Sequence, residues 1–254
     1  MVIPAYQAEG TLAQLLAELE IAQEEFNQHL PVLVIDDGSS DATSAVARAS
    51  GAVVVRHPRN RGKGAALQTA LAWAAERGMS CMVTLDADGQ HPPRAAVALS
   101  RHLASPGALL LGVRDLVAAG APAANQWSNQ FSNRVLSLFA GARLLDTQCG
   151  LRRYPVVETR KLGATDAGYA FEADVVLRAA RTGLAIEHVP TPVIYPPDRV
   201  SHFDSVADPA RIVLRVVRTT LSVPHHRPLR RWTGRLLVLL VGCALLGAAL
   251  GLVT

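Results

Sequence analysis

Short apolar runs alternate with longer segments in which apolar residues recur every three or four positions. The short runs predict β-strands, and the longer segments predict amphipathic helices. The expected strands cover residues 2–4, 32–36, 52–56, 81–85, 108–113 and 184–189. Strands that alternate with helices favour an α/β fold with a mostly parallel central sheet.

Helical periodicity gives most of the remaining elements. Helices are expected at residues 64–77, 93–103, 124–140 and 171–182, with another that begins near Ser40 or Asp41. One more helix is expected between the first two strands, and its apolar face comprises Leu12, Leu15, Leu16, Leu19 and Phe26. Thr11 and Gln14 are spaced as a capping box for that helix.

The pattern changes after residue 203. Along residues 206–223 one helical side carries Val206, Ala210, Val213, Val217 and Leu221, and the arginines lie elsewhere. A basic amphipathic helix on a membrane surface is the preferred interpretation. A solvated helix packed on the preceding domain is the alternative.

Residues 236–254 contain no charged side chain. An apolar helix of 18 residues is about 27 Å long and can span a thin bilayer. Seven arginines and no carboxylate lie between residues 210 and 235, which predicts a cytoplasmic flank on an anionic membrane rather than a nucleic-acid site. A buried core helix is the alternative for the apolar run.

Composition limits the number of domains and the kinds of cysteine site that the chain can have. The chain has 254 residues, 50% of them hydrophobic, and a formal net charge of +4. This length suits one α/β domain with a short appendage. Three widely spaced cysteines indicate neither a disulfide framework nor a zinc cluster. Because no cleavable signal peptide is visible, we expect the catalytic part to be cytoplasmic.

A candidate metal site follows the strand at residues 81–85. Asp86 and Asp88, with the amide oxygen of Gln90, offer the oxygen ligands that Mg²⁺ or Mn²⁺ prefers. The carboxyl end of a strand is also where α/β sheets bind ligands. Such a metal would neutralise a leaving diphosphate, whereas the alternative is a pair of capping or loop acids.

Two further segments support a nucleotide site. Asp36 and Asp37 precede Gly38 after a second apolar strand, where a carboxylate is suited to a base or ribose hydroxyl. Their alternative role is to cap the following helix. Residues 59–66 place basic side chains, including Lys63, ahead of a helix N-terminus, which favours phosphate. The alternative there is a solvated basic loop.

These motifs, in this order, resemble glycosyltransferase family 2. They comprise Val2-Ile3-Pro4-Ala5-Tyr6, Asp36-Asp37-Gly38-Ser39, residues 59–66, Asp86-Ala87-Asp88-Gly89-Gln90-His91-Pro92, Gly112-Val113-Arg114, Asp146-Thr147-Gln148-Cys149-Gly150-Leu151-Arg152, Phe171-Glu172-Ala173-Asp174, Tyr195 and Ser201-His202-Phe203. The most similar branch contains dolichol-phosphate mannose synthase and bacterial polyprenyl-phosphate glycosyltransferases. The resemblance implies a GT-A domain at 1–203. The charge and hydropathy pattern adds a basic juxtamembrane segment at 204–235 and a transmembrane helix at 236–254.

The resemblance also implies roles for individual residues. The nucleotide-sugar site would comprise Pro4, Ala5, Tyr6, Glu9, Asp36, Asp37, Lys63, Asp86 and Ala87. The metal ligands would be Asp86, Asp88 and Gln90, and the acceptor phosphate would lie near Arg114, Ser132 and Arg134.

The expected activity is an inverting, metal-dependent transfer from a UDP- or GDP-sugar to a polyprenyl phosphate, catalysed by a single-pass inner-membrane protein. The catalytic residues would include Asp88 and Arg114. A hydroxyl acceptor would instead need a carboxylate base, for which Glu172, Asp174 and Asp146 are candidates. A catalytically inactive membrane scaffold is the third hypothesis, and a homo-oligomer is left open.

Overall fold

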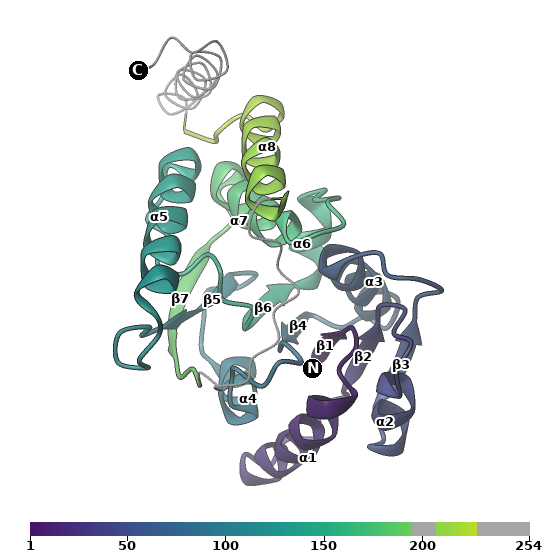
Figure 1. Ribbon diagram of the computed structural model, residues 1–254. Helices are drawn as coiled ribbons and strands as arrows, with labels where there is room; N and C mark the ends of the chain where they lie inside the picture. Colours follow the sequence, from purple (N-terminus) through teal and green to yellow (C-terminus); the bar gives the residue numbers. More distant parts are fainter. Residues whose placement is uncertain (195–206, 228–254) are drawn as a thin grey trace.

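The structure is a computed structural model that describes residues 1–194 and 207–227 (Figure 1). Its centre is one seven-stranded sheet in the order β3-β2-β1-β4-β6-β5-β7. The strands are β1 Val2–Ala5, β2 Leu33–Asp36, β3 Val53–Arg56, β4 Cys81–Thr84, β5 Leu109–Arg114, β6 Arg152–Pro155 and β7 Ile186–Thr191. Only β6 among these runs antiparallel to its neighbours, so the mostly parallel sheet is confirmed for the described residues.

Helices cover both faces of the sheet, and each face has its own apolar core. On one face lie α1 Glu9–Glu25, α2 Thr43–Ala49 and α4 Pro93–Arg101. On the other lie α3 Lys63–Glu76, α5 Ala123–Ala140, α6 Val156–Lys161, α7 Ala170–Thr182 and α8 Ala207–Ser222. Strands between the two layers are buried on both sides, which explains their continuous apolar runs.

Two elements were not expected from the sequence pattern. Strand β6 has the sequence Arg-Arg-Tyr-Pro, which is neither an apolar run nor an alternating one. It is ordered by pairing on both sides, with β4 and with β5. Helix α6 follows it directly and spans only six residues, too few for a visible helical period.

The predicted capping box at the start of α1 is wrong. The helix begins at Glu9, before Thr11, and has no side-chain cap. The Thr11 hydroxyl donates instead to the carbonyl of Ala87 at 2.7 Å, and Gln14 donates to Glu18. Thr11 therefore ties α1 to the Asp-x-Asp turn.

Helix α8 packs on α7 along one face, which agrees with the alternative of a helix packed on the preceding domain. Val216, Thr219 and Thr220 are buried there, and Arg215 pairs with Asp166 at 2.8 Å. Other apolar side chains of α8, namely Val213, Leu214 and Leu221, are 45%, 50% and 55% exposed. Contact of that exposed part with a membrane stays a prediction.

The predicted transmembrane helix at residues 236–254 lies outside the described residues, as do Tyr195 and the motif at 201–203. In the two described ranges, no helix combines the length and apolar character that a membrane crossing requires.

Candidate active site

The expected site residues gather at one edge of the sheet. Strands β1, β2 and β4 are parallel, and β5 runs the same way because the antiparallel β6 separates it from β4. Their carboxyl ends therefore meet at a single edge, where open α/β sheets bind ligands. Asp36, Asp86 and Arg114 each lie at or directly after one of these ends.

Asp36 is fully buried at the end of β2. Its carboxylate accepts hydrogen bonds from the Ser39 amide and the Ser44 hydroxyl, and Arg56 lies 3.4 Å away. Burial would raise the pKa of Asp36, but hydrogen bonds from the two serines and the Arg56 charge outweigh it and hold the pKa below its usual range. Asp36 is therefore an ionised group that stabilises the turn after β2.

Asp37 organises the loop that precedes α3. It accepts hydrogen bonds from the backbone amides of Arg61 and Gly62, and from His57 Nδ1 at 2.6 Å. Gly38 lies next to this loop at φ +78°, and a Cβ there would be 2.3 Å from the Arg59 backbone. The close approach fixes the loop so that Lys63 begins α3 at the sheet edge.

Lys63 joins two carboxylates from distant parts of the chain. Its Nζ lies 2.8 Å from Asp86 Oδ1 and 3.0 Å from Glu172 Oε2. Burial disfavours the ammonium charge, but Asp86 and Glu172 reverse that effect and raise the pKa of Lys63. Burial likewise opposes ionisation of Asp86, and Lys63 nevertheless holds the pKa of Asp86 below its usual range. The site contains a charged ammonium between two carboxylates.

Two residues that sequence reasoning left without a role support this group. A Cβ at Gly150 would be 2.1 Å from the Asp86 carboxylate, so only glycine leaves room for that side chain. Arg152 is buried and donates to the carbonyls of Thr147, Cys149 and Glu172. Both residues belong to a motif visible in the sequence, but only the structure shows that they support Asp86.

The residues present fit a divalent metal. The Asp88 carboxylate accepts a hydrogen bond from the backbone N–H of Gln90 at 3.1 Å, which brings these two candidate ligands into one turn. Among the described residues, no three His, Cys, Asp or Glu side chains form a metal cluster. Mg²⁺ nevertheless needs only one or two carboxylates when phosphates complete its shell. Asp86, which would contribute to that shell, already has a cationic partner in the Lys63 ammonium.

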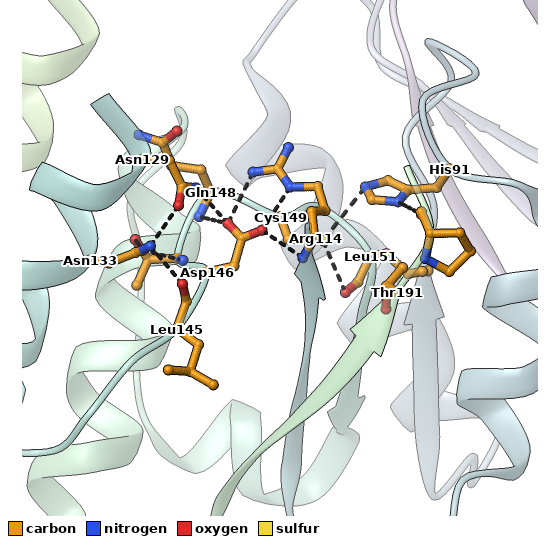
Figure 2. Close-up of polar contacts among 12 residues, drawn as sticks. His91, Arg114, Asn129, Asn133, Leu145, Asp146, Gln148, Cys149, Leu151 and Thr191 are labelled. Carbon is orange, nitrogen blue, oxygen red and sulfur yellow. Dashed lines mark hydrogen bonds and ion pairs between the residues drawn. The ribbon is translucent and has the colours of Figure 1, made fainter. Parts of the chain in front are cut away.

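Arg114, at the end of β5, is held by Asp146 (Figure 2). Its Nε and a terminal nitrogen donate to the two carboxylate oxygens at 2.7 and 3.0 Å. Asn129 Nδ2 also donates to Asp146 at 2.7 Å, and Asn133 donates in turn to Asn129. Burial opposes ionisation of Asp146, but Arg114 holds its pKa below the usual range. The guanidinium is thereby oriented by α5.

His91 follows the Asp-x-Asp turn and is buried. It is 2% exposed, and its ring contacts Pro192 O and Cys149 Sγ (Figure 2). Burial lowers its pKa, while the charges of Asp86 and Arg114 act on the ring in opposite directions. His91 is therefore a neutral-favouring, buried ring that packs against Cys149 and the backbone after β7.

Other expected residues lie apart from this group. Asp174 is fully buried and pairs with Arg178 at 2.9 Å and with Thr219 of α8. Ser132 accepts a hydrogen bond from Gln148, while Arg134 is exposed on α5. Glu9 accepts a hydrogen bond from the Ala42 amide. Pro4, Ala5 and Tyr6 lie at the end of β1, beside Asp36.

The chain belongs to glycosyltransferase family 2, because the family model for Glycosyl transferase family 2 matches residues 1–149. It is a glycosyltransferase whose described part has the GT-A-like fold expected from its motifs.

Named relatives refine this placement. The chain is 30% identical over 205 residues to an undecaprenyl-phosphate mannosyltransferase of Micrococcus luteus, covering 74% of this chain and 80% of the relative. It is 28% identical over 203 residues to a polyprenol monophosphomannose synthase of Mycolicibacterium smegmatis, covering 75% of each. These similarities place it with the polyprenyl-phosphate branch of the family.

A solved structure supports the fold. Glucosyl-3-phosphoglycerate synthase from Mycobacterium tuberculosis, crystallised with Mn²⁺, UDP and phosphoglyceric acid, matches with a TM-score of 0.63 at 22% identity. The match covers 89% of this chain and 78% of that one.

Proposed function

We propose that this chain transfers a sugar from a UDP- or GDP-sugar to a polyprenyl phosphate at the cytoplasmic face of a membrane. The observation that carries the proposal is the gathering of two charged groups at one edge of the sheet. Lys63 with Asp86 and Glu172 lies after β4, and Arg114 with Asp146 lies at the end of β5. A donor diphosphate suits the first position, and an acceptor phosphate suits the second. The names of the relatives support the lipid acceptor.

The proposed reaction is one inverting displacement. An ionised oxygen of the acceptor phosphate attacks the anomeric carbon of the sugar. The bond from that carbon to the diphosphate breaks, and its electron pair leaves with the nucleoside diphosphate. No proton is removed from the acceptor, so positioning and charge stabilisation supply the catalysis.

Each residue would act through its charge. Asp86, Asp88 and Gln90 would hold Mg²⁺ or Mn²⁺, which supplies positive charge to the leaving diphosphate. Lys63 would bind the diphosphate, and Arg114, oriented by Asp146, would bind the acceptor phosphate. Asp36 and the end of β1 would receive the nucleoside.

A hydroxyl acceptor is the second candidate, and one observation favours it. Glu172 Oε1 is buried and accepts no hydrogen bond among the described residues, although Arg152 Nε lies 3.7 Å away, so it could receive a hydroxyl proton. Asp174 Oδ2 has no hydrogen bond among these residues either, but Asp174 Oδ1 binds Arg178 and Thr219 at the α7–α8 contact. Glu172→Gln should abolish transfer to a hydroxyl, whereas transfer to a phosphate should retain activity once Lys63 is satisfied by the donor.

The membrane anchor in this proposal is the uncharged segment 236–254, with its arginine-rich flank on the cytoplasmic side. A catalytically inactive scaffold is the remaining alternative, and the intact charged groups at the sheet edge weigh against it.

The decisive experiment supplies the purified protein with Mg²⁺ or Mn²⁺, a panel of UDP- and GDP-sugars and a polyprenyl phosphate. Mass spectrometry should detect a sugar-linked lipid and a nucleoside diphosphate, and both should disappear in Asp88→Asn. Donor cleavage without a lipid product would refute the lipid acceptor, while absence of any donor binding would favour the scaffold.

A further inference from the structure

The loop between α6 and α7 packs on the start of α3. The backbone N–H of Ala65 donates to the carbonyl of Ala167 at 2.9 Å, and Gln68 Nε2 donates to the carbonyl of Asp166 at 2.7 Å. The first of these bonds satisfies an amide in the first turn of α3, which has no carbonyl partner within its own helix. Residues 166–168 therefore form a bracing segment across the N-terminus of α3.

Two glycines let the bracing segment approach Lys63 closely. Gly62 and Gly64 stand on either side of Lys63. A Cβ at Gly62 would be 2.6 Å from the carbonyl oxygen of Ala167, and a Cβ at Gly64 would be 2.5 Å from that of Asp166. Because the segment lies directly against the backbone that carries Lys63, a displacement of the segment also releases this lysine.

The bracing segment also begins α7. The backbone N–H of Phe171 donates to the carbonyl of Gly168 at 3.1 Å, and Glu172 follows in the first turn of the helix. Glu172 is the carboxylate that lies 3.0 Å from Lys63 Nζ. The same three residues thus contact the backbone on both sides of the Lys63–Glu172 pair.

Helix α8 holds the bracing segment through an ion pair. Arg215 Nε and one terminal nitrogen donate to Asp166 Oδ2 at 3.1 and 2.8 Å. The other oxygen, Asp166 Oδ1, accepts a hydrogen bond from the Gly168 amide at 2.9 Å. Each side chain of the pair is 20% exposed, so water screens it less than an ion pair on the open surface. Asp166 therefore joins α8 to the turn that precedes α7.

A second carboxylate lies near Arg215 but has other partners. The remaining terminal nitrogen of Arg215 is 4.0 Å from Asp174 Oδ2. Asp174 binds Arg178 and Thr219 through its other oxygen. Asp166 is therefore the main partner of Arg215. Helix α7, which carries Asp174, contacts both α8 and α3 (Figure 1).

We propose that Arg215 is a positioning residue for the donor site. Through Asp166 it holds the bracing segment against α3 and thereby keeps Lys63 and Glu172 in place. Helix α8 then contributes to donor binding through this segment and not by contact with the diphosphate. The inference rests on the proposed function for its effect on the donor, whereas the effect on the segment itself is measurable without a ligand.

Hydrogen exchange of the full chain tests the structural step. Arg215→Met removes the ion pair and keeps an unbranched side chain, and we expect amides 62–68 to exchange several-fold faster. Val216→Ala is the matched control, because it reduces the buried apolar packing of α8 and leaves the ion pair in place. Exchange at 62–68 that equals the parent, or that rises equally in both variants, would overturn the proposal.

Binding of UDP or GDP with Mn²⁺, measured by calorimetry, tests the consequence for the donor. We expect Arg215→Met to weaken nucleoside diphosphate binding about fivefold, a common size for coupling through a contact network, and Val216→Ala to leave it nearly unchanged. Arg215→Lys should recover part of the affinity, because it keeps the charge but not the two-bond geometry.

A double-mutant cycle identifies Asp166 as the link. Asp166→Asn removes the charge and keeps an acceptor for the Gly168 amide, so it should weaken nucleoside diphosphate binding about as much as Arg215→Met. The two changes together should be little worse than either alone, because both break one interaction. Losses that simply add would contradict a path through this pair.

Kinetics separate positioning from a general loss of structure. In Arg215→Met the KM for the nucleotide sugar should rise, while the KM for polyprenyl phosphate should stay the same. A merely structural role would reduce the amount of active protein, and so kcat, without this difference. Donor affinity and donor KM equal to the parent would overturn the proposal. If the parent binds neither UDP nor GDP, the proposed function fails, while exchange at 62–68 still decides whether Arg215 holds the segment.

Discussion

The ammonium group of Lys63 lies 2.8 Å from Asp86, the first acid of the Asp-x-Asp sequence, and 3.0 Å from Glu172. The positive charge that these carboxylates require is therefore already supplied by α3. If Asp86 holds the divalent cation that we propose, that cation would compete with this ammonium for Asp86 until a donor diphosphate offered Lys63 another anionic partner.

Lys63→Met should affect metal and donor binding in opposite directions. Without the competing ammonium, we expect Mn²⁺ to bind the donor-free protein roughly tenfold more tightly, a common size for coupling between sites. Nucleoside diphosphate should bind more weakly, because a charged contact is lost. Calorimetric titration with Mn²⁺ and with UDP or GDP measures both, and Lys161→Met on α6 is the control. Unchanged Mn²⁺ affinity would show that the two cations do not compete.

Gly150→Ala should displace the Asp86 carboxylate. The added Cβ would be 2.1 Å from an Asp86 carboxylate oxygen, so the Asp86 side chain or the backbone at residue 150 must move. We expect a stability loss of about 1–3 kcal/mol, as for an overpacked site, and a much larger fractional loss of activity. Thermal unfolding and donor-cleavage assays measure these effects. Gly10→Ala is the control, since its Cβ meets nothing within 4 Å. Full activity in Gly150→Ala would mean that Asp86 need not occupy its present position.

Arg181→Met should loosen α8. The Arg181 side chain donates to the carbonyls of Phe139, Thr220 and Val223, which end α5 and α8. Loss of these donors leaves buried acceptors unsatisfied, and we expect a cost of about 2–4 kcal/mol. Hydrogen exchange should report the change first along residues 212–223. Arg218→Met, on the exposed side of α8, should leave exchange as it is. Equal exchange in both variants would contradict this structural role.

Asp146 should make the stability of the fold depend on pH in the acidic range. Its pKa is lower in the folded state, so it stabilises the fold above the unfolded value of about 3.9 and loses that contribution as the pH falls through the folded value. Asp146→Asn should cost about 3 kcal/mol near neutral pH, because it breaks a buried ion pair. The difference from the parent should shrink below about pH 4. Denaturation across this pH range measures it, with Asp115→Asn as the exposed control. A constant difference would exclude the Arg114–Asp146 charge interaction as its cause.

The position of Asp36 and Asp86 at one edge of the sheet could be predicted because it is encoded locally. Asp36 and Asp86 each follow an apolar strand, and the carboxyl ends of parallel strands meet at one edge. Nothing local links Lys63 to Glu172, or Arg114 to Asp146, since each pair is brought together by folding over long sequence separations. Strand β6 was not predicted for the same reason, because its pairing with β4 and β5 orders it and its own sequence is not apolar.

Helix α8 shows a second limit. Its amphipathic pattern was visible, but a helical wheel cannot distinguish an apolar face that packs on α7 from one that meets lipid. This helix carries both a buried apolar residue, Val216, and an exposed one, Leu221.

The reversed strand β6 separates β1 to β4, whose ends are proposed to hold the donor, from β5 and the Arg114–Asp146 pair. The proposed donor side nevertheless depends on residues that follow β5 in the sequence, because Gly150 leaves room for Asp86 and Glu172 pairs with Lys63. Exchange of the chain after residue 106 would therefore replace the proposed acceptor side and part of the support of the donor side together. In a lineage with this architecture, a change of acceptor would have to preserve Gly150 and Glu172 if the sugar nucleotide is to stay the same.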